Sequence, residues 1–177
     1  MKLSRSVLLV ALALLAHTGC GYSLAGRGSF LPAYIKRIGI PQFANNTAVF
    51  DLDRQVTERV RTEFIGRGKY TIVTDTTGVD ALLTGTIASV TLAPVAFNQQ
   101  NLATRYALTL TATVEFKDMH ANKVLWTNPS MQYREEFALN PTNTPDSTTF
   151  LVQDVSARER MAGEFARALV SAILEAF

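Results

Sequence analysis

The chain has 177 residues with 17 basic and 15 acidic side chains, a single cysteine and a hydrophobic fraction of 47%. This length is that of one domain with a sizeable buried core. The single cysteine excludes an internal disulfide. A formal net charge of +2 is far from the basic excess of a nucleic-acid-binding protein, so we expect no nucleic-acid partner.

Residues 1–19 have the layout of a bacterial secretory signal. Lys2 and Arg5 supply positive charge, and the apolar run that follows is too short to span a bilayer. We expect cleavage before Cys20 and acylation of its thiol, although His17 stands where lipoprotein signals usually carry leucine. The alternative is an ordinary secreted protein with one free thiol. Cleavage would remove two basic and no acidic residues, leaving 15 of each.

Residues 20–33 form a glycine-containing tether, and residues 34–177 form the single domain. About 13 extended residues reach roughly 45 Å, which holds the domain close to its membrane. Gly21 follows Cys20 where an aspartate would retain a lipoprotein at the inner membrane. We therefore expect a protein anchored by lipid to the periplasmic face of the outer membrane.

The first part of the domain predicts a strand, a helix and a strand. Residues 34–43 alternate as a strand whose regular pairing ends at Pro41, and residues 70–74 form a second, short strand. Between them, residues 50–67 predict a helix. Its apolar stripe has a spacing of four and consists of Leu52, Val56, Val60 and Phe64. This order suggests a right-handed crossover between parallel strands.

Two long strands follow. The apolar positions of residues 81–95 change face part of the way along, which predicts a bulge near Ala88. Residues 105–117 alternate strictly, so we expect an antiparallel strand with one buried and one wet face. The buried face would carry Tyr106, Leu108, Leu110, Ala112, Val114 and Phe116.

The last part of the domain predicts a hairpin partner and a closing helix. Residues 123–127 begin a strand that resumes over 131–139 after Pro129, and a loop covers 140–147. Residues 149–176 predict one long amphipathic helix. The full order is β-α-β-β-β-β-α, an α/β (α+β) two-layer sandwich. Two amphipathic helices would pack on one face of a mixed four- to five-stranded sheet.

The mature chain offers little catalytic chemistry. Its one histidine, His120, lies in the predicted turn between the two antiparallel strands, and Cys20 would be acylated. A metal site of histidine and cysteine ligands is therefore excluded within one chain, and a serine triad lacks its Gly-x-Ser-x-Gly elbow. We expect no enzyme, no metal and no cofactor, but a binding or assembly protein.

Several segments resemble the LptE family of lipopolysaccharide-assembly lipoproteins in that family's order. These segments are Gly19 to Tyr22, Leu31 to Thr47, Val56 to Phe64, Asp80 to Ile87 and Val124 to Trp126. The resemblance implies the fold derived above, a partnership with the LptD β-barrel as plug and assembly factor, and contact with lipopolysaccharide during its export to the cell surface. The wet face of residues 105–117 could then bond to the polar wall of a barrel lumen.

Lipopolysaccharide carries clustered phosphates, so basic side chains are its natural contacts. The candidates are Arg105 and Lys117 on the wet face, Lys123 beside the turn, and Lys36 and Arg37 as second choices. No family motif selects these residues, and each could equally be an ordinary solvated charge.

Other readings of the chain remain open. Lipoprotein activators of peptidoglycan synthases and curli-secretion lipoproteins also begin with a strand, an Asn-rich loop and a helix, and the stretch Ile38 to Phe43 would suit them. A short tether speaks against an activator, which must reach across the periplasm. A periplasmic protein that binds a small ligand is a third possibility, but no convergent polar cluster supports it.

Overall fold

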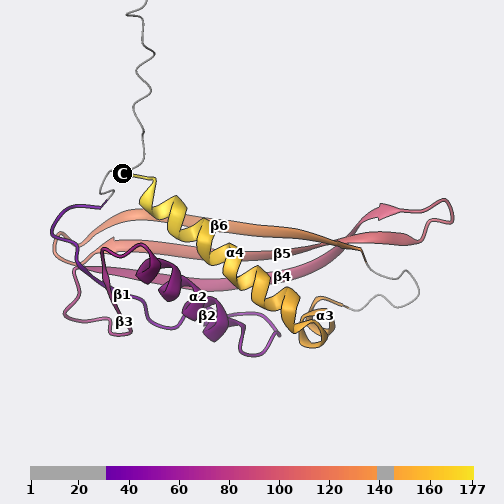
Figure 1. Ribbon diagram of the computed structural model, residues 1–177, viewed down its shortest axis with the longest axis horizontal. Coiled ribbons are helices and arrows are strands. Elements are labelled where there is room, and N and C mark those ends of the chain that lie inside the picture. The colour runs from indigo at the N-terminus through magenta and orange to yellow at the C-terminus, as the bar shows by residue number, and fades with distance from the viewer. Residues whose placement is uncertain (1–30, 139–145) are drawn as a thin grey trace, which may run out of the picture.

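The computed structural model describes residues 31–138 and 146–177 (Figure 1). In chain order the elements are β1 (Arg37–Gly39), β2 (Ala44–Asn45), α2 (Leu52–Gly66), β3 (Thr71–Val73), β4 (Ala81–Phe97), β5 (Ala103–Asp118), β6 (Lys123–Ala138), α3 (Ser147–Gln153) and α4 (Val155–Leu174). The predicted order is confirmed, with β2 as an added short strand. Within the described residues, no helix is long and apolar enough to cross a membrane.

The sheet is mixed, as expected. Its strand order is β3-β1-β4-β5-β6, and β2 also pairs with β4. β1 is parallel to both β3 and β4, so β1, α2 and β3 form the predicted crossover unit. The three long strands β4, β5 and β6 are antiparallel neighbours. This arrangement brings the starts of β1, β3, β4 and β6 and the end of β5 to one end of the molecule.

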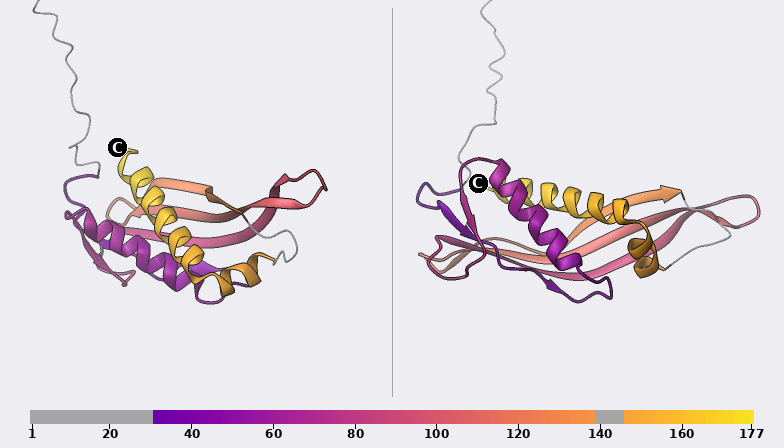
Figure 2. Two further views of the ribbon diagram at one scale, coloured as in Figure 1. Left: turned by 45° about the vertical axis from the view of Figure 1, so that its right-hand side comes forward. Right: turned by 60° about the horizontal axis from the view of Figure 1, so that its bottom comes forward.

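The helices α2 and α4 lie side by side across one face of the sheet (Figure 2). Their apolar stripes and the inner face of the sheet form one continuous core, because each element alone leaves an apolar face exposed. The largest fully buried side chains come from both layers and include Phe64, Phe116, Phe165, Leu83, Leu108 and Met161. Leu31 already belongs to this core at 3% exposure.

Strand β5 confirms the predicted alternation, since all six residues of its predicted inner face are buried. The register of β4 against β5 shifts between Ile87 and Ser89, which confirms the bulge near Ala88. After the shift, Val90 and Leu92 pack against the core, as the earlier Leu83 and Ile87 do. The bulge therefore keeps a 17-residue strand apolar on one side.

Three boundaries differ from the prediction. The expected strand over 34–43 is two separate pieces, β1 and β2, because Pro41 interrupts the pairing. β6 instead runs unbroken past Pro129, and the chain absorbs the proline in a register shift against β5. The expected single helix over 149–176 is divided into α3 and α4 at Asp154, whose side chain accepts the Ala157 N–H at 2.8 Å and so starts a new helix.

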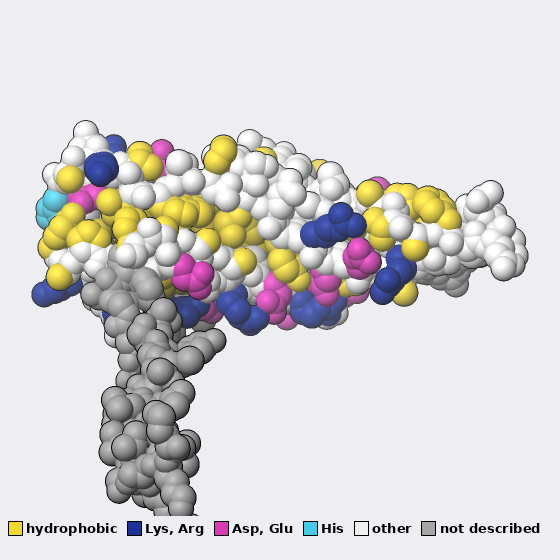
Figure 3. Space-filling model, turned by 90° about the horizontal axis from the view of Figure 1, so that it is seen from above, with side chains coloured by type: hydrophobic (Ala, Val, Ile, Leu, Met, Phe, Trp, Pro, Cys, Tyr) yellow, Lys and Arg dark blue, Asp and Glu magenta, His cyan; other side chains and the backbone are white. Residues whose placement is uncertain are grey.

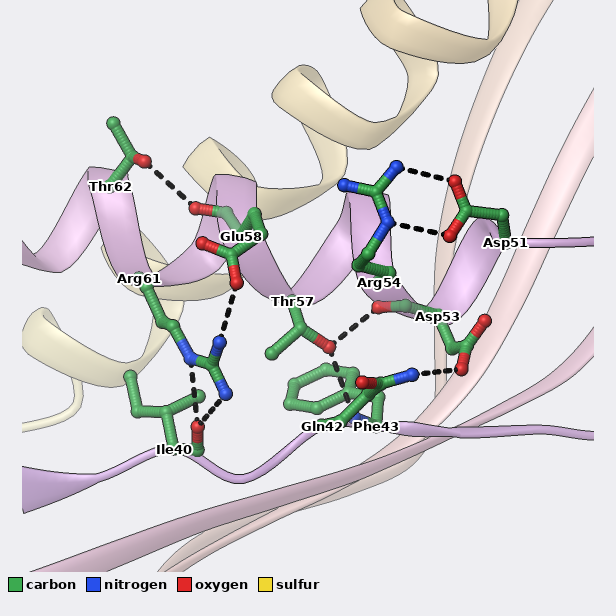
Figure 4. Close-up of polar contacts among 10 residues, drawn as sticks. All are labelled: Ile40, Gln42, Phe43, Asp51, Asp53, Arg54, Thr57, Glu58, Arg61 and Thr62. Atoms are coloured by element: carbon green, nitrogen blue, oxygen red, sulfur yellow. Dashed lines mark hydrogen bonds and ion pairs between the residues drawn. The ribbon is translucent and has the colours of Figure 1, made fainter. Parts of the chain in front are cut away.

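Polar contacts fix α2 to the chain between β1 and β2 (Figure 4). Arg61 donates to the Ile40 carbonyl through Nε at 2.9 Å and through a terminal nitrogen at 2.6 Å. The Thr57 hydroxyl, only 1% exposed, accepts the Phe43 N–H at 3.0 Å and donates to the Asp53 carbonyl at 2.6 Å. These bonds satisfy backbone groups where Pro41 interrupts the ladder.

Candidate functional site

Four of the five predicted basic residues meet at one end of the molecule. We call this the tether end, and it consists of residues 31–37, 69–71, 79–81 and 117–123, where the described chain begins (Figure 1). Lys36, Arg37, Lys117 and Lys123 all lie there. Arg105 does not, because it lies twelve residues from Lys117 along β5, roughly 40 Å at about 3.3 Å per residue.

The sheet register explains this gathering. Ile38 of β1 pairs with Ala81 of β4, which pairs with Asp118 of β5, which pairs with Lys123 of β6. Residues next to this row, although distant in sequence, are therefore within a few strand spacings of about 4.8 Å.

The structure adds Lys69, which the sequence analysis missed. Lys69 precedes β3, and the parallel register of Arg37 with Thr71 places it beside Lys36. Both lysines line one pocket of about 430 Å³, whose other walls include Leu31, Ile35 and Tyr70. A pocket with apolar walls and two cations suits an amphipathic, anionic group better than a neutral polar one.

Lysines and arginines are used differently in this protein. Arg37 lies 3.9 Å from Asp75, and further arginines form ion pairs along the helices and the strands β5 and β6, namely Arg54, Arg61, Arg67, Arg105, Arg134, Arg160 and Arg167. In Figure 3, basic and acidic side chains accordingly alternate along one side of the molecule. In residues 31–138 and 146–177, Lys36, Lys69, Lys117 and Lys123 have no ion pair.

Arg105 is partly neutralised on the open side of the sheet. It lies 3.7 Å from Glu136, which also contacts Arg134 at 3.4 Å. All three side chains are at least 40% exposed, so these pairs are weak. Arg134 is a second basic residue near Arg105 that the sequence analysis did not select.

A polar cluster orders the tether end around Asp80. One Asp80 carboxylate oxygen accepts the backbone N–H groups of Arg37 at 2.8 Å and Lys36 at 2.9 Å, and the other lies 2.8 Å from His120 Nε2. The Arg37 N–H, then His120 and the Lys36 N–H, lower the pKa of Asp80 to about 2. The carboxylate therefore stays charged and holds the entry to β1.

Asp118 completes the cluster from the end of β5. It accepts the backbone N–H groups of His120 at 2.8 Å and Ala121 at 3.0 Å, and the Tyr34 hydroxyl donates to its other oxygen. The Tyr34 hydrogen bond is the main cause that lowers the pKa of Asp118. Tyr34 also packs edge-on against the His120 ring. Asp80 and Asp118 are 38 residues apart in the sequence, and folding brings them together.

The opposite side of the sheet carries none of the described helices and is polar, and we call it the open face. It carries Thr84, Thr86, Ser89 and Thr91 from β4, Thr109, Thr111, Thr113 and Glu115 from β5, and Gln132, Arg134 and Glu136 from β6. None of these residues is buried. The β4–β5 hairpin extends past the helices, and its end exposes Val95, Phe97 and Leu102 (Figure 1).

The polar groups of the tether end serve structural contacts. The described part of the chain has no group of three histidine, cysteine or acidic side chains that could hold a metal ion. The carboxylate oxygens of Asp80 and Asp118 are already bonded to backbone N–H groups, His120 and Tyr34. These contacts stabilise the local structure. The predicted lipidation site, Cys20, lies outside the described residues.

Solved structures with similar folds come from several bacteria. A hypothetical protein from Chlamydia trachomatis matches with a TM-score of 0.51 and 11% identity over 78% of this chain and 95% of that chain. Rare lipoprotein B from Shewanella oneidensis has a TM-score of 0.48 and 15% identity, over 79% and 98%. A minor lipoprotein from Acinetobacter baumannii has a TM-score of 0.48 and 14% identity, over 81% and 94%. At these identities the likeness concerns the fold alone.

Sequence comparison identifies the family more directly. A comparison with curated proteins found no matching relative. The family model described as LptE, lipopolysaccharide-assembly, matches residues 35–173, which span β1 to α4 and nearly the whole domain. The resemblance noted from short segments is thus confirmed over the whole fold, and the chain belongs to the LptE family of lipopolysaccharide-assembly proteins.

Proposed function

We propose that this protein is an outer-membrane lipoprotein, anchored through Cys20 with its domain, residues 34–177, on the periplasmic face. It partners an LptD-like β-barrel as plug and assembly factor, and it binds lipopolysaccharide during export to the cell surface. The protein acts by binding and has no catalytic step. The observation that carries this proposal is the LptE family match over residues 35–173.

The open face supports the partnership with a barrel. Three long neighbouring strands present hydroxyl, amide and charged side chains on one uncovered side. A barrel lumen is lined by polar side chains, which hydroxyl groups can meet as either donors or acceptors. On the helical side of the molecule, in contrast, arginine and acidic side chains already form ion pairs with one another.

Affinity purification from outer membranes tests the partnership. We expect the tagged full-length protein to recover a large β-barrel protein in stoichiometric amount. Glutamate or lysine at Thr111, in the middle of the open face, should reduce that recovery, because it buries a charge against the barrel wall. The matched control is the same change at Ala168, an exposed position on α4. Recovery of a peptidoglycan synthase in place of the barrel would overturn the proposal.

Lipopolysaccharide contact is proposed for the basic candidates, of which Lys117 and Lys123 are the unpaired ones on β5 and β6. We expect Lys117→Glu with Lys123→Glu to weaken lipopolysaccharide binding by about tenfold or more, since a hydrogen bond to a charged group contributes about 1.5 kcal/mol or more. Arg105→Glu should change the affinity much less, because Glu136 already contacts this arginine. Titration of purified protein with lipopolysaccharide measures both.

Circular dichroism and thermal melting establish that the variants are folded. Unchanged binding in the folded double variant would remove Lys117 and Lys123 from the contact surface. A larger loss of lipopolysaccharide affinity with Arg105→Glu would indicate that the contact lies in the half of the sheet nearer the β4–β5 hairpin.

A further inference from the structure

Every lysine within the described residues lies at the tether end. Lys36, Lys69, Lys117 and Lys123 come from four different segments of the chain, yet the sheet register brings them to one end, and Lys36 and Lys69 also share one pocket. Lysine is a compact, strongly hydrated charge that attracts anions at long range without fixed geometry. These lysines, at one end only, differ from the ion-paired arginines elsewhere.

Exposed apolar side chains accompany these lysines. Tyr34 is 49% exposed, Met119 38% and Val124 41%, and all three belong to or adjoin the tether end. The C-terminal Phe177, 49% exposed, lies at the same end of the molecule (Figure 1). Lysines mixed with aromatic and aliphatic side chains are the composition of a surface that contacts lipid headgroups and the upper acyl region.

The pocket between Lys36 and Lys69 gives this surface a specific contact point. Leu31 and Ile35 are each 3% exposed, so the inner wall is formed by the core itself, while both lysines are exposed at its rim. Two acidic groups of this end are engaged by other partners: Asp80 by backbone N–H groups and His120, and Asp118 by Tyr34 and the turn. A phosphate at the rim would therefore meet cations that have no competing partner among the described residues.

We propose that the tether end binds the surface of an anionic phospholipid bilayer, with Lys36 and Lys69 contacting headgroup phosphates. The placement relies on the lipid anchor of the proposed function, because residues 20–30 connect Cys20 to Leu31 at this same end and reach at most about 37 Å at about 3.4 Å each. The tether end then lies at the lipid surface beside the anchor.

Vesicle flotation tests the inference without the anchor. The chain from residue 20 with Cys20→Ser keeps the whole core, which begins at Leu31. We expect it to float with vesicles of phosphatidylglycerol and phosphatidylcholine and not with phosphatidylcholine alone, and to dissociate as salt is raised. Each lysine near an anionic surface contributes about fivefold to binding, so Lys36→Gln with Lys69→Gln should weaken it more than about tenfold.

The matched control is Arg105→Gln with Arg134→Gln, which removes the same charge from the other end of the open face. Equal weakening by this control, or equal flotation with uncharged vesicles, would overturn the inference. Titration with lipopolysaccharide provides the separate readout: a protein that binds lipopolysaccharide but not phosphatidylglycerol vesicles contradicts the bilayer contact alone and leaves the proposed function intact. We expect Lys36→Gln with Lys69→Gln to lose vesicle binding and to keep lipopolysaccharide binding. That result would assign the bilayer to Lys36 and Lys69, and lipopolysaccharide to Lys117 and Lys123.

Discussion

Alanine at position 85 should destabilise the protein by about 3 kcal/mol, the upper part of the usual range for overpacking a core. A Cβ atom on Gly85 of β4 would lie 2.4 to 2.8 Å from three ring atoms of Phe43. That ring is 2% exposed, and the Phe43 backbone N–H is bonded to the buried Thr57 hydroxyl. The ring therefore cannot move aside without disturbing α2. Urea unfolding measures the change in free energy.

Two further variants separate this clash from a general effect of alanine. Gly163 of α4 has no atom within 4 Å of an added Cβ, so Gly163→Ala should stabilise the helix by about 0.5 to 1 kcal/mol. Phe43→Leu combined with Gly85→Ala should cost less than the sum of the two single changes, because leucine vacates ring positions that the new methyl needs. A Gly85→Ala protein as stable as the parent would contradict this packing.

The sequence was most informative where one chemical pattern repeats over many residues. The alternation in β5 fixes which side chains are buried, and the change of face in β4 locates the bulge at Ala88, because both depend only on the period of a strand. The division of the last helix was not predictable in the same way. Asp154 breaks no apolar periodicity, and only its capping geometry shows that α3 ends and α4 begins there.

The candidate site depended on register, which a single sequence does not encode locally. The sequence places Lys117 on the wet face and Lys123 beside the turn, but Lys69 joins them only through the parallel pairing of β1 with β3. Arg105 was grouped with Lys117 because both share a strand face, although they lie at opposite ends of that strand. The alternation of a single strand shows on which face of the sheet a residue lies. Which residues of other strands lie beside it depends on the pairing of segments that are distant in the sequence.

Removal of the Asp80 carboxylate should have the second large effect on stability. Asp80→Ala leaves the backbone N–H groups of Lys36 and Arg37 without their acceptor and removes the contact with His120. Since each hydrogen bond to a charged group contributes about 1.5 kcal/mol or more, we expect a loss of about 2 to 3 kcal/mol near neutral pH. Asp75→Ala is the matched control, because the Asp75 side chain is 66% exposed and its ion pair is long at 3.9 Å.

The same carboxylate predicts a pH dependence. The pKa of Asp80 is lowered from 3.8 to about 2, so the unfolded chain takes up its proton first as the pH falls. The stabilisation is therefore complete above about pH 4 and is lost as the pH falls through about 2. In urea unfolding at a series of pH values, the difference in stability between the parent and Asp80→Asn should shrink over this window. A difference that stays constant from pH 5 to 2 would mean that the charge of Asp80 does not hold the entry to β1.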